Sequence, residues 1–317
     1  MTDITPKLPL LAVAQNLRAI GLLVAGIALF SVQDLILKLL SGNYPLSEAM
    51  VFRSLTALPL IWVLVLFDGG SRTLFTPGMM RMIGRGFVVF APYTLYYLAL
   101  AALPIATVVA LFFAAPLFIT LLSVPMLGEK VGRPRWTAVI IGFGGVVLMA
   151  RPGTDLFDWA ALLAVAAAST YALAMISARQ LGRSETASAM AFWGNAVFLL
   201  CATLLSLIFG AGQFEGASHK SLAFLTRAWV TPSPQDLALM CTCGVIAAIA
   251  LTLLTQAYRM GEASIVASFE YTAMIWGVIF GWMFFADWPT RTGWIGISII
   301  SGAGLFVLWR EYRAKRV

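Results

Sequence analysis

Apolar residues form ten long blocks along the chain, and short polar segments separate them. A helix that crosses a membrane needs about 20 predominantly apolar residues, because the hydrocarbon core is about 30 Å thick. The blocks therefore predict ten transmembrane helices. Their expected bounds are 19–40, 46–67, 82–102, 105–127, 134–150, 157–178, 187–209, 236–258, 263–285 and 292–310. The pattern indicates an all-α membrane protein with short loops and no separate soluble domain.

The composition agrees with this pattern. Hydrophobic residues make up 61% of the 317 residues and charged residues only 11%, whereas soluble domains carry roughly 25% charged residues. The first apolar block is too long for the core of a signal peptide, which has about 7–15 residues, and it carries two charges. We therefore expect it to be retained as the first span.

The placement of the basic residues predicts the orientation. With both chain ends inside, fifteen of the 21 Lys and Arg residues lie in inner positions and four lie in outer loops. Inner loops of membrane proteins carry an excess of Lys and Arg. The net charge of +7 is thus a topology signal and does not indicate nucleic-acid binding. We expect cytoplasmic termini and a location in the bacterial inner membrane.

Two parts of the chain resemble each other. Ala106-Thr-Val-Val-Ala-Leu-Phe112 is similar to Ala263-Ser-Ile-Val-Ala-Ser-Phe269, and Glu129 and Trp136 correspond to Asp287 and Trp294. This predicts two repeats of five helices, at 19–150 and 157–310, between an N-terminal segment at 1–18 and a basic tail at 311–317. Five is odd, so the second repeat enters the membrane from the opposite side. Inverted repeats are typical of alternating-access transporters.

Several motifs point to a known family. The segment Ser31-Val-Gln-Asp-Leu-Ile-Leu-Lys38, followed by Pro45 and Arg53, resembles the opening of EamA-type members of the drug/metabolite transporter superfamily. The second-repeat motif that begins at Ala263 and the Gly128-Glu129 step resemble the same family. Within it, the chain is most similar to the YddG group of bacterial aromatic amino-acid exporters. The resemblance implies a ten-helix fold with a central cavity and amino-acid efflux. Ala286-Asp287 departs from the Gly-Glu that the family often shows.

Four charged residues stand out inside the expected spans, where each costs roughly 2.5–3.5 kcal/mol unless it faces a cavity or a partner. Asp34 and Lys38 are four residues apart on one helix face and can pair. Arg53 lies at a similar depth. These three form either a substrate or gating cluster or an inter-helix salt bridge, with snorkelling as a further role for Lys38. Glu270 suits an ammonium group, a coupling proton or a structural hydroxyl partner.

Uncharged residues complete the candidate site. Tyr93, Tyr96 and Tyr97 share one face of the third span. Pro116 lies within the fourth span, where it removes a backbone hydrogen bond and allows either gating or a static kink. The remaining candidates are polar or aromatic residues within or at the ends of later spans, each of which could equally pack in the interior: Trp193, Asn195, Gln256, Tyr271 and Trp276.

These features predict a transporter rather than an enzyme. Cys201, Cys241, Cys243 and the one histidine, His219, lack metal-ligand spacing, so we expect no metal and no cofactor. No phosphate-binding loop is present, and an intramembrane enzyme is a distant alternative. We predict export of amino acids, preferably aromatic or hydrophobic ones, by secondary-active or facilitative alternating access. Export of lipophilic cations, drugs or other small metabolites is the alternative, and the sequence leaves monomer and homodimer open.

Overall fold

The computed structural model describes residues 8–128, 132–150, 158–181, 184–260 and 269–314, and within them it contains helices and connecting turns but no strands. The helices are α1 (Leu8–Leu40), α2 (Leu46–Phe67), η1 (Ser71–Leu74), α3 (Met79–Ala102), α4 (Ile105–Phe112), α5 (Ala115–Leu127), α6 (Arg133–Ala150), α7 (Ala160–Leu181), α8 (Ala187–Phe209), α9 (Lys220–Thr226), α10 (Pro234–Met260), η2 (Phe269–Tyr271), α12 (Thr272–Phe285) and α13 (Arg291–Ala314). The expected all-α class is confirmed for these residues.

Seven segments of the described chain are long and apolar enough to cross a membrane. The spans expected at 46–67 and 187–209 coincide with α2 and α8. Two shorter apolar helices, Trp136–Ala150 and Phe269–Phe285, lie where the fifth and ninth spans were expected. The beginning of the ninth expected span falls on residues 261–268, outside the described residues.

The fourth expected span is one apolar segment divided into two helices. α4 ends at Phe112 and α5 begins at Ala115, directly before Pro116. Proline has no N–H to donate to the carbonyl of residue 112, and its ring crowds that carbonyl. The interruption therefore has a local cause in the sequence, and it bends the chain next to the candidate site.

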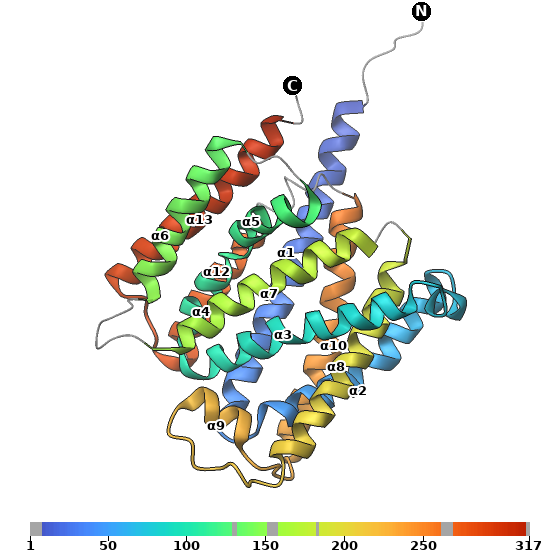
Figure 1. Cartoon of the computed structure of the whole chain (residues 1–317), viewed down its shortest axis with the longest axis vertical. Coiled ribbons are helices and arrows are strands. Elements are labelled where there is room, and N and C mark those ends of the chain that lie inside the picture. The colour runs from blue at the N-terminus through green and yellow to red at the C-terminus, as the bar shows by residue number, and fades with distance from the viewer. Residues whose placement is uncertain (1–7, 129–131, 151–157, 182–183, 261–268, 315–317) are drawn as a thin grey trace, which may run out of the picture.

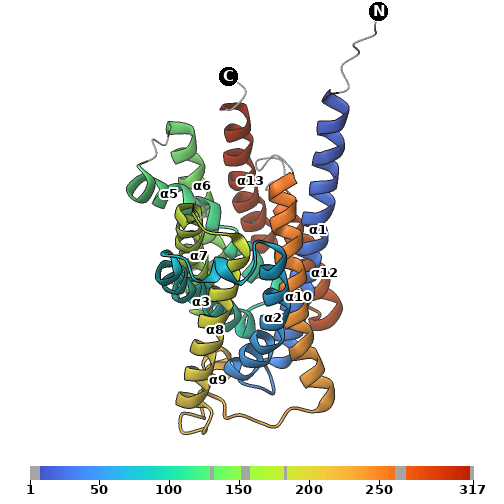
Figure 2. The same cartoon turned by 90° about the vertical axis from the view of Figure 1, so that its right-hand side faces the viewer.

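Long helices pack in pairs that are distant in sequence. α1 packs along α10, α3 along α7, α2 along α8, and α6 along α13; these neighbours can be followed in Figures 1 and 2. The beginning of α1 and the end of α13 lie at the same end of the bundle in both views, and α9 lies at the other end. An even number of membrane crossings is consistent with that arrangement.

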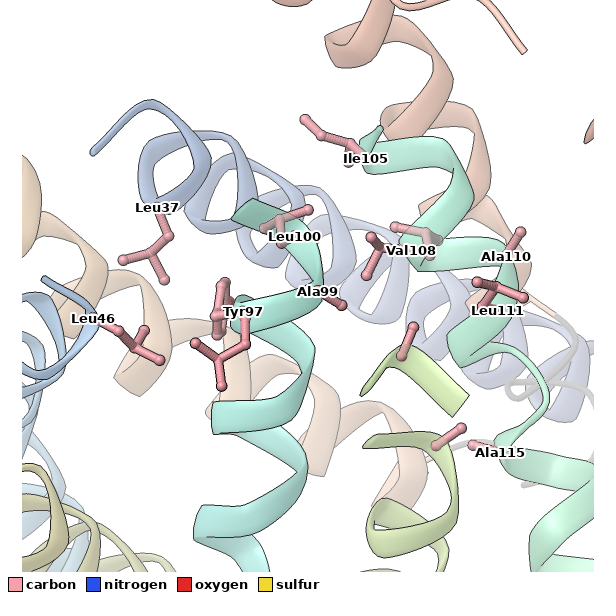
Figure 3. Close-up of a cluster of buried hydrophobic side chains, with 14 of the residues drawn as sticks. Leu37, Leu46, Tyr97, Ala99, Leu100, Ile105, Val108, Ala110, Leu111 and Ala115 are labelled. Carbon is pink, nitrogen blue, oxygen red and sulfur yellow. The ribbon is translucent and has the colours of Figure 1, made fainter. Parts of the chain in front are cut away.

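The main hydrophobic cluster extends through most of the bundle, and one part of it lies where α1, α2, α3 and α4 meet. Leu37, Leu46, Tyr97, Leu100 and Ile105 are almost fully buried there, and Figure 3 shows them in one group. The helices α2 and α10 are also in close contact. A Cβ on Gly244 of α10 would overlap the main-chain oxygen of Arg53, so α10 approaches α2 more closely than a larger residue would allow. These contacts hold α1, α2 and α3 around one polar group.

Candidate functional site

Asp34 of α1 accepts two hydrogen bonds from the tyrosine face of α3. The Tyr96 hydroxyl donates to Oδ2 at 2.9 Å, and the Tyr97 hydroxyl donates to Oδ1 at 2.8 Å. Both tyrosines lie one turn of α3 beyond Tyr93, which places the three rings on one side of the helix. A carboxylate inside a membrane protein needs such donors, because burial without them is costly. The carboxylate is thus held between two helices.

Gln33, which the sequence-based predictions did not include, connects Asp34 to Arg53. Its Nε2 donates to the Tyr97 hydroxyl at 2.8 Å and to the Tyr93 hydroxyl at 3.3 Å. Its Oε1 accepts a hydrogen bond of 3.3 Å from Arg53 Nε. Gln33 is only 1% exposed, and a buried amide needs partners for both of its ends. Its position beside Asp34 in an apolar span was the sequence signal that could have indicated it.

Arg53 is held over two aromatic rings as well. Its guanidinium carbon lies 4.5 Å from the centre of the Tyr93 ring and 5.3 Å from the centre of the Phe198 ring. The ring faces attract the cation, and planar guanidinium stacks well on them. The hydrogen bonds run from Arg53 through Gln33 and Tyr97 to Asp34. We call these residues, with Tyr93 and Tyr96, the outer polar cluster.

Lys38 has partners other than Asp34. Its ammonium group donates to the main-chain oxygens of Leu100, at 2.9 Å, and of Leu103. It also lies 5.2 Å from the centre of the Phe285 ring. These carbonyls end α3, where a positive charge is favoured by the helix dipole. Among the described residues, the structure therefore pairs Lys38 with the end of α3 rather than with Asp34 one turn away.

A second group of polar residues surrounds Tyr171 of α7. The Tyr171 hydroxyl interacts electrostatically with Arg85 of α3 and with Glu270 of η2. Glu270 also interacts with the neighbouring Tyr271, whose ring centre is 4.7 Å from that of Phe113. Arg85 is one of the fifteen basic residues that the sequence-based predictions assigned to inner positions, and it was not predicted as a site residue. It lies within α3, and its Nε atom is buried. We call Arg85, Tyr171, Glu270 and Tyr271 the inner polar cluster.

Aromatic rings connect the two clusters. The ring centres of Tyr97 and Tyr96 are 5.2 Å apart, those of Tyr96 and Phe112 are 5.1 Å apart, and those of Phe112 and Tyr171 are 5.1 Å apart. Tyr96, Phe112 and Tyr171 are only half-buried. Three separate elements, α3, α4 and α7, supply this series of rings. We call it the ring ladder.

The remaining predicted site residues have other surroundings. Trp193 Nε1 donates to the Leu74 main-chain oxygen, and Asn195 Nδ2 donates to that of Ser54, each at 3.0 Å. Trp276 packs on Phe280 and beside the α1–α10 contact. The side chain of Gln256 is exposed, and Pro116 lies in the first turn of α5. The structure therefore joins Asp34, Arg53, Tyr93 and Tyr97 in one cluster and places Glu270 and Tyr271 in another.

A surface groove of about 340 Å³ has no lining residue in either cluster. It is lined by Val51, Trp229 and residues of α8. The lining is almost entirely apolar and offers no charged group, so the groove does not have the chemistry of a site for polar metabolites. The polar clusters remain the candidate site.

Comparisons with known proteins identify the family. The sequence model of the EamA-like transporter family matches residues 17–151 and, separately, residues 158–309. A riboflavin transporter of Rhizobium johnstonii is 33% identical over 217 residues, which are 68% of this chain and 66% of that protein. An S-adenosylmethionine uptake transporter of Rickettsia felis is 27% identical over 96% of both chains. A pseudopaline exporter of Pseudomonas aeruginosa is 25% identical over 85% of this chain and 89% of that protein.

The fold is also shared with a solved structure. A crystal structure superposes on 96% of this chain and 98% of its own chain, with a TM-score of 0.58 and 19% sequence identity. The family matches cover most of the chain, and seven described segments can cross a membrane. The expected relation to EamA-type transporters is confirmed. This chain is a multi-pass membrane protein that belongs to the EamA-like transporter family.

Proposed function

We propose that the protein is a secondary-active or facilitative carrier of the bacterial inner membrane for a small metabolite that has a planar ring and charged groups. The ring ladder between the two polar clusters is the observation that carries this proposal. Half-buried aromatic faces suit a planar ring, whereas Asp34, Arg53 and Glu270 suit charged groups at its ends. A purely structural salt bridge would not require this series of rings.

Alternating access between two inverted repeats is part of the proposal. The two family matches fall on either side of residue 154, near the proposed repeats. If α1, α2 and α3 correspond to α7, α8 and α10, then the α1–α10 contact corresponds to the α7–α3 contact. The α2–α10 and α8–α3 contacts likewise correspond, and all four contacts are observed. This exchange supports a twofold relation, which allows one scaffold to open to either side. Ten spans belong to the same scheme, and the distribution of basic residues supports cytoplasmic termini.

The names of the relatives bear on which compounds the protein carries. Their names specify riboflavin, S-adenosylmethionine and pseudopaline rather than aromatic amino acids. We therefore broaden the class to aromatic and heteroaromatic metabolites with charged groups, in which aromatic amino acids are included. The relatives' names include both uptake and export, so the direction of transport is part of what must be measured. A lipophilic cation, the alternative cargo, would use the rings and the acidic residues but not Arg53.

Counterflow in proteoliposomes tests the proposal. Liposomes that contain the purified protein would be loaded with unlabelled phenylalanine, riboflavin, S-adenosylmethionine or tetraphenylphosphonium, and uptake of the labelled compound would be followed with and without a pH gradient. We expect exchange of at least one of the first three compounds above protein-free liposomes. An Asp34→Asn variant should lose that exchange, whereas the Gln256→Ala variant, whose parent side chain is exposed, should retain it.

The outcomes separate the candidates. Exchange of tetraphenylphosphonium alone would support the lipophilic-cation alternative and contradict the proposed cargo class. Uptake that requires a pH gradient would assign proton coupling, and uptake without one would assign facilitative exchange. Absence of exchange for all four compounds, with correctly folded protein, would contradict the proposed class of cargo.

A further inference from the structure

Arg85 is a charged residue whose burial the network around Asp34 does not explain. It lies six residues into α3, which is about 9 Å along the helix axis at 1.5 Å per residue. Its side chain is half-buried, and its Nε atom is fully buried without a hydrogen-bond partner among the described residues. Arg53, by contrast, donates to Gln33 and stacks on two rings. A guanidinium in this environment requires an acceptor.

No described group accepts a hydrogen bond from the Nε atom of Arg85. The Tyr171 hydroxyl interacts electrostatically with Arg85 but is neutral when protonated. Glu270 interacts with the same Tyr171, so the cation and the acid are arranged around one tyrosine. A buried N–H without an acceptor costs about 1–3 kcal/mol, and the Arg85 Nε is such a donor. A bound anion would accept this hydrogen bond whenever the site is occupied.

We propose that the Arg85 guanidinium is a subsite for an oxyanion, a carboxylate or a phosphate, on the transported metabolite. The planar fork of guanidinium matches both groups through paired N–H donors. Tyr171, the ring of the ladder on α7, interacts electrostatically with Arg85, and Tyr96 of the ladder lies eleven residues further along α3, which is about 16 Å at 1.5 Å per residue. A metabolite whose acidic group contacts Arg85 can therefore place its ring on the ring ladder. The inference deepens the proposed function and rests on it for the identity of the ligand as cargo.

Matched probe pairs test the subsite by binding rather than by transport. The purified full-length protein would be titrated with phenylalanine and phenylalaninamide, with flavin mononucleotide and riboflavin, and with inorganic phosphate, and its thermal unfolding temperature would be recorded. A ligand that binds the folded state raises this temperature according to its concentration and affinity. We expect the wild type to bind the acid-bearing member of at least one pair at least tenfold more tightly.

Variants assign the preference to Arg85. Arg85→Gln should reduce the preference at least tenfold, and Arg85→Lys should retain part of it, because lysine keeps the charge but not the fork. Arg81→Gln is the matched control: Arg81 lies one turn earlier on the same helix, and its side chain is exposed. It should leave the preference unchanged. The unliganded unfolding temperature of each variant would show whether it is folded.

Several results would overturn the inference. It fails if Arg85→Gln retains the wild-type preference, if it weakens both members of each pair equally, or if the wild type binds neither phosphate nor any acid-bearing probe. A lipid phosphate is the other source of the same chemistry. If a lipid phosphate binds Arg85, the Arg85→Gln substitution should change the unfolding temperature in phosphatidylglycerol nanodiscs but not in phosphatidylcholine nanodiscs, and it should not change the probe preference. That result would overturn the assignment to cargo. Counterflow without an Arg85 effect contradicts this inference alone, whereas an Arg85 effect on binding without counterflow contradicts the proposed transport alone.

Discussion

At the scale of single residues, the buried hydroxyl of Tyr97 both accepts and donates a hydrogen bond in the outer polar cluster. It accepts a hydrogen bond from Gln33 and donates one to Asp34, each at 2.8 Å, and the residue is 3% exposed. Among the described residues, Tyr96 makes only the donation to Asp34. Two neighbouring tyrosines on one helix therefore differ in how many buried partners depend on them.

This difference predicts unequal effects of the same substitution. Tyr97→Phe leaves one Asp34 oxygen without its donor and Gln33 without its shorter acceptor. A buried group left without a partner costs about 1–3 kcal/mol, so we expect the thermal unfolding temperature to fall more for Tyr97→Phe than for Tyr96→Phe. Counterflow should decrease in the same order. Equal unfolding temperatures for the two variants would contradict the assigned hydrogen bonds.

At the scale of helices, α5 and α12 end in the same backbone conformation with different residues. α5 ends at Gly128 with φ of 67°, and α12 ends at Ala286 with φ of 55°. Ala286 is the one non-glycine residue with positive φ in the described chain. The left-handed conformation costs an L-residue other than glycine roughly 1–2 kcal/mol. The Ala286 departure seen in the sequence thus corresponds to local backbone strain.

Exchanging the two residue types tests this strain. Ala286→Gly should raise the unfolding temperature, although the more flexible unfolded chain offsets part of the gain. Gly128→Ala should lower it by an amount that corresponds to about 1 kcal/mol, because alanine is strained at positive φ. No atom lies within 4 Å of a Cβ at Gly128, so a steric clash would not explain that loss. Unfolding temperatures that change in the opposite directions would contradict the interpretation.

The interrupted helices show a limit of local reasoning. The offset of 157 residues aligns Phe113 and Ala114, between α4 and α5, with Glu270 and Tyr271 of η2. Both repeats therefore change helix geometry at equivalent positions, and Phe113 contacts Tyr271. The first repeat has Pro116 there, but the second has Ala273. Proline explains the break between α4 and α5, whereas the change from η2 to α12 occurs without a proline.

At the scale of the whole molecule, the ends of the bundle differ in their connections. In Figure 1, α9 and the long loop before it lie at the end of the bundle opposite the chain termini, whereas the loop that carries η1 lies at the right-hand side, away from α9. The excess of basic residues predicts that the end opposite α9 faces the cytoplasm. Ser71 and Ser218 are exposed serines in these two loops, so they offer matched positions for a label.

Cysteine labelling tests this orientation. In whole cells, a membrane-impermeant maleimide should label the Ser218→Cys variant and should label the Ser71→Cys variant only after permeabilisation. The native Cys201 and Cys243 are buried and Cys241 is half-buried, and the wild type measures their background labelling. Labelling of Ser71→Cys in intact cells, with none of Ser218→Cys, would reverse the proposed topology.

The sequence by itself determined the class, most helix bounds and the family. Long apolar blocks report locally on contact with lipid, so α2 and α8 were predicted to the residue. The same locality explains what the sequence left open. The spacing of Asp34 and Lys38 allowed the two to pair, but partners depend on the rotation and contact of neighbouring helices. Only the tertiary structure showed that Asp34 accepts hydrogen bonds from Tyr96 and Tyr97 and that Gln33 donates to Tyr97. It also placed Arg85 beside Tyr171. Hydropathy is a property of one segment, whereas a binding site is a property of several segments packed together.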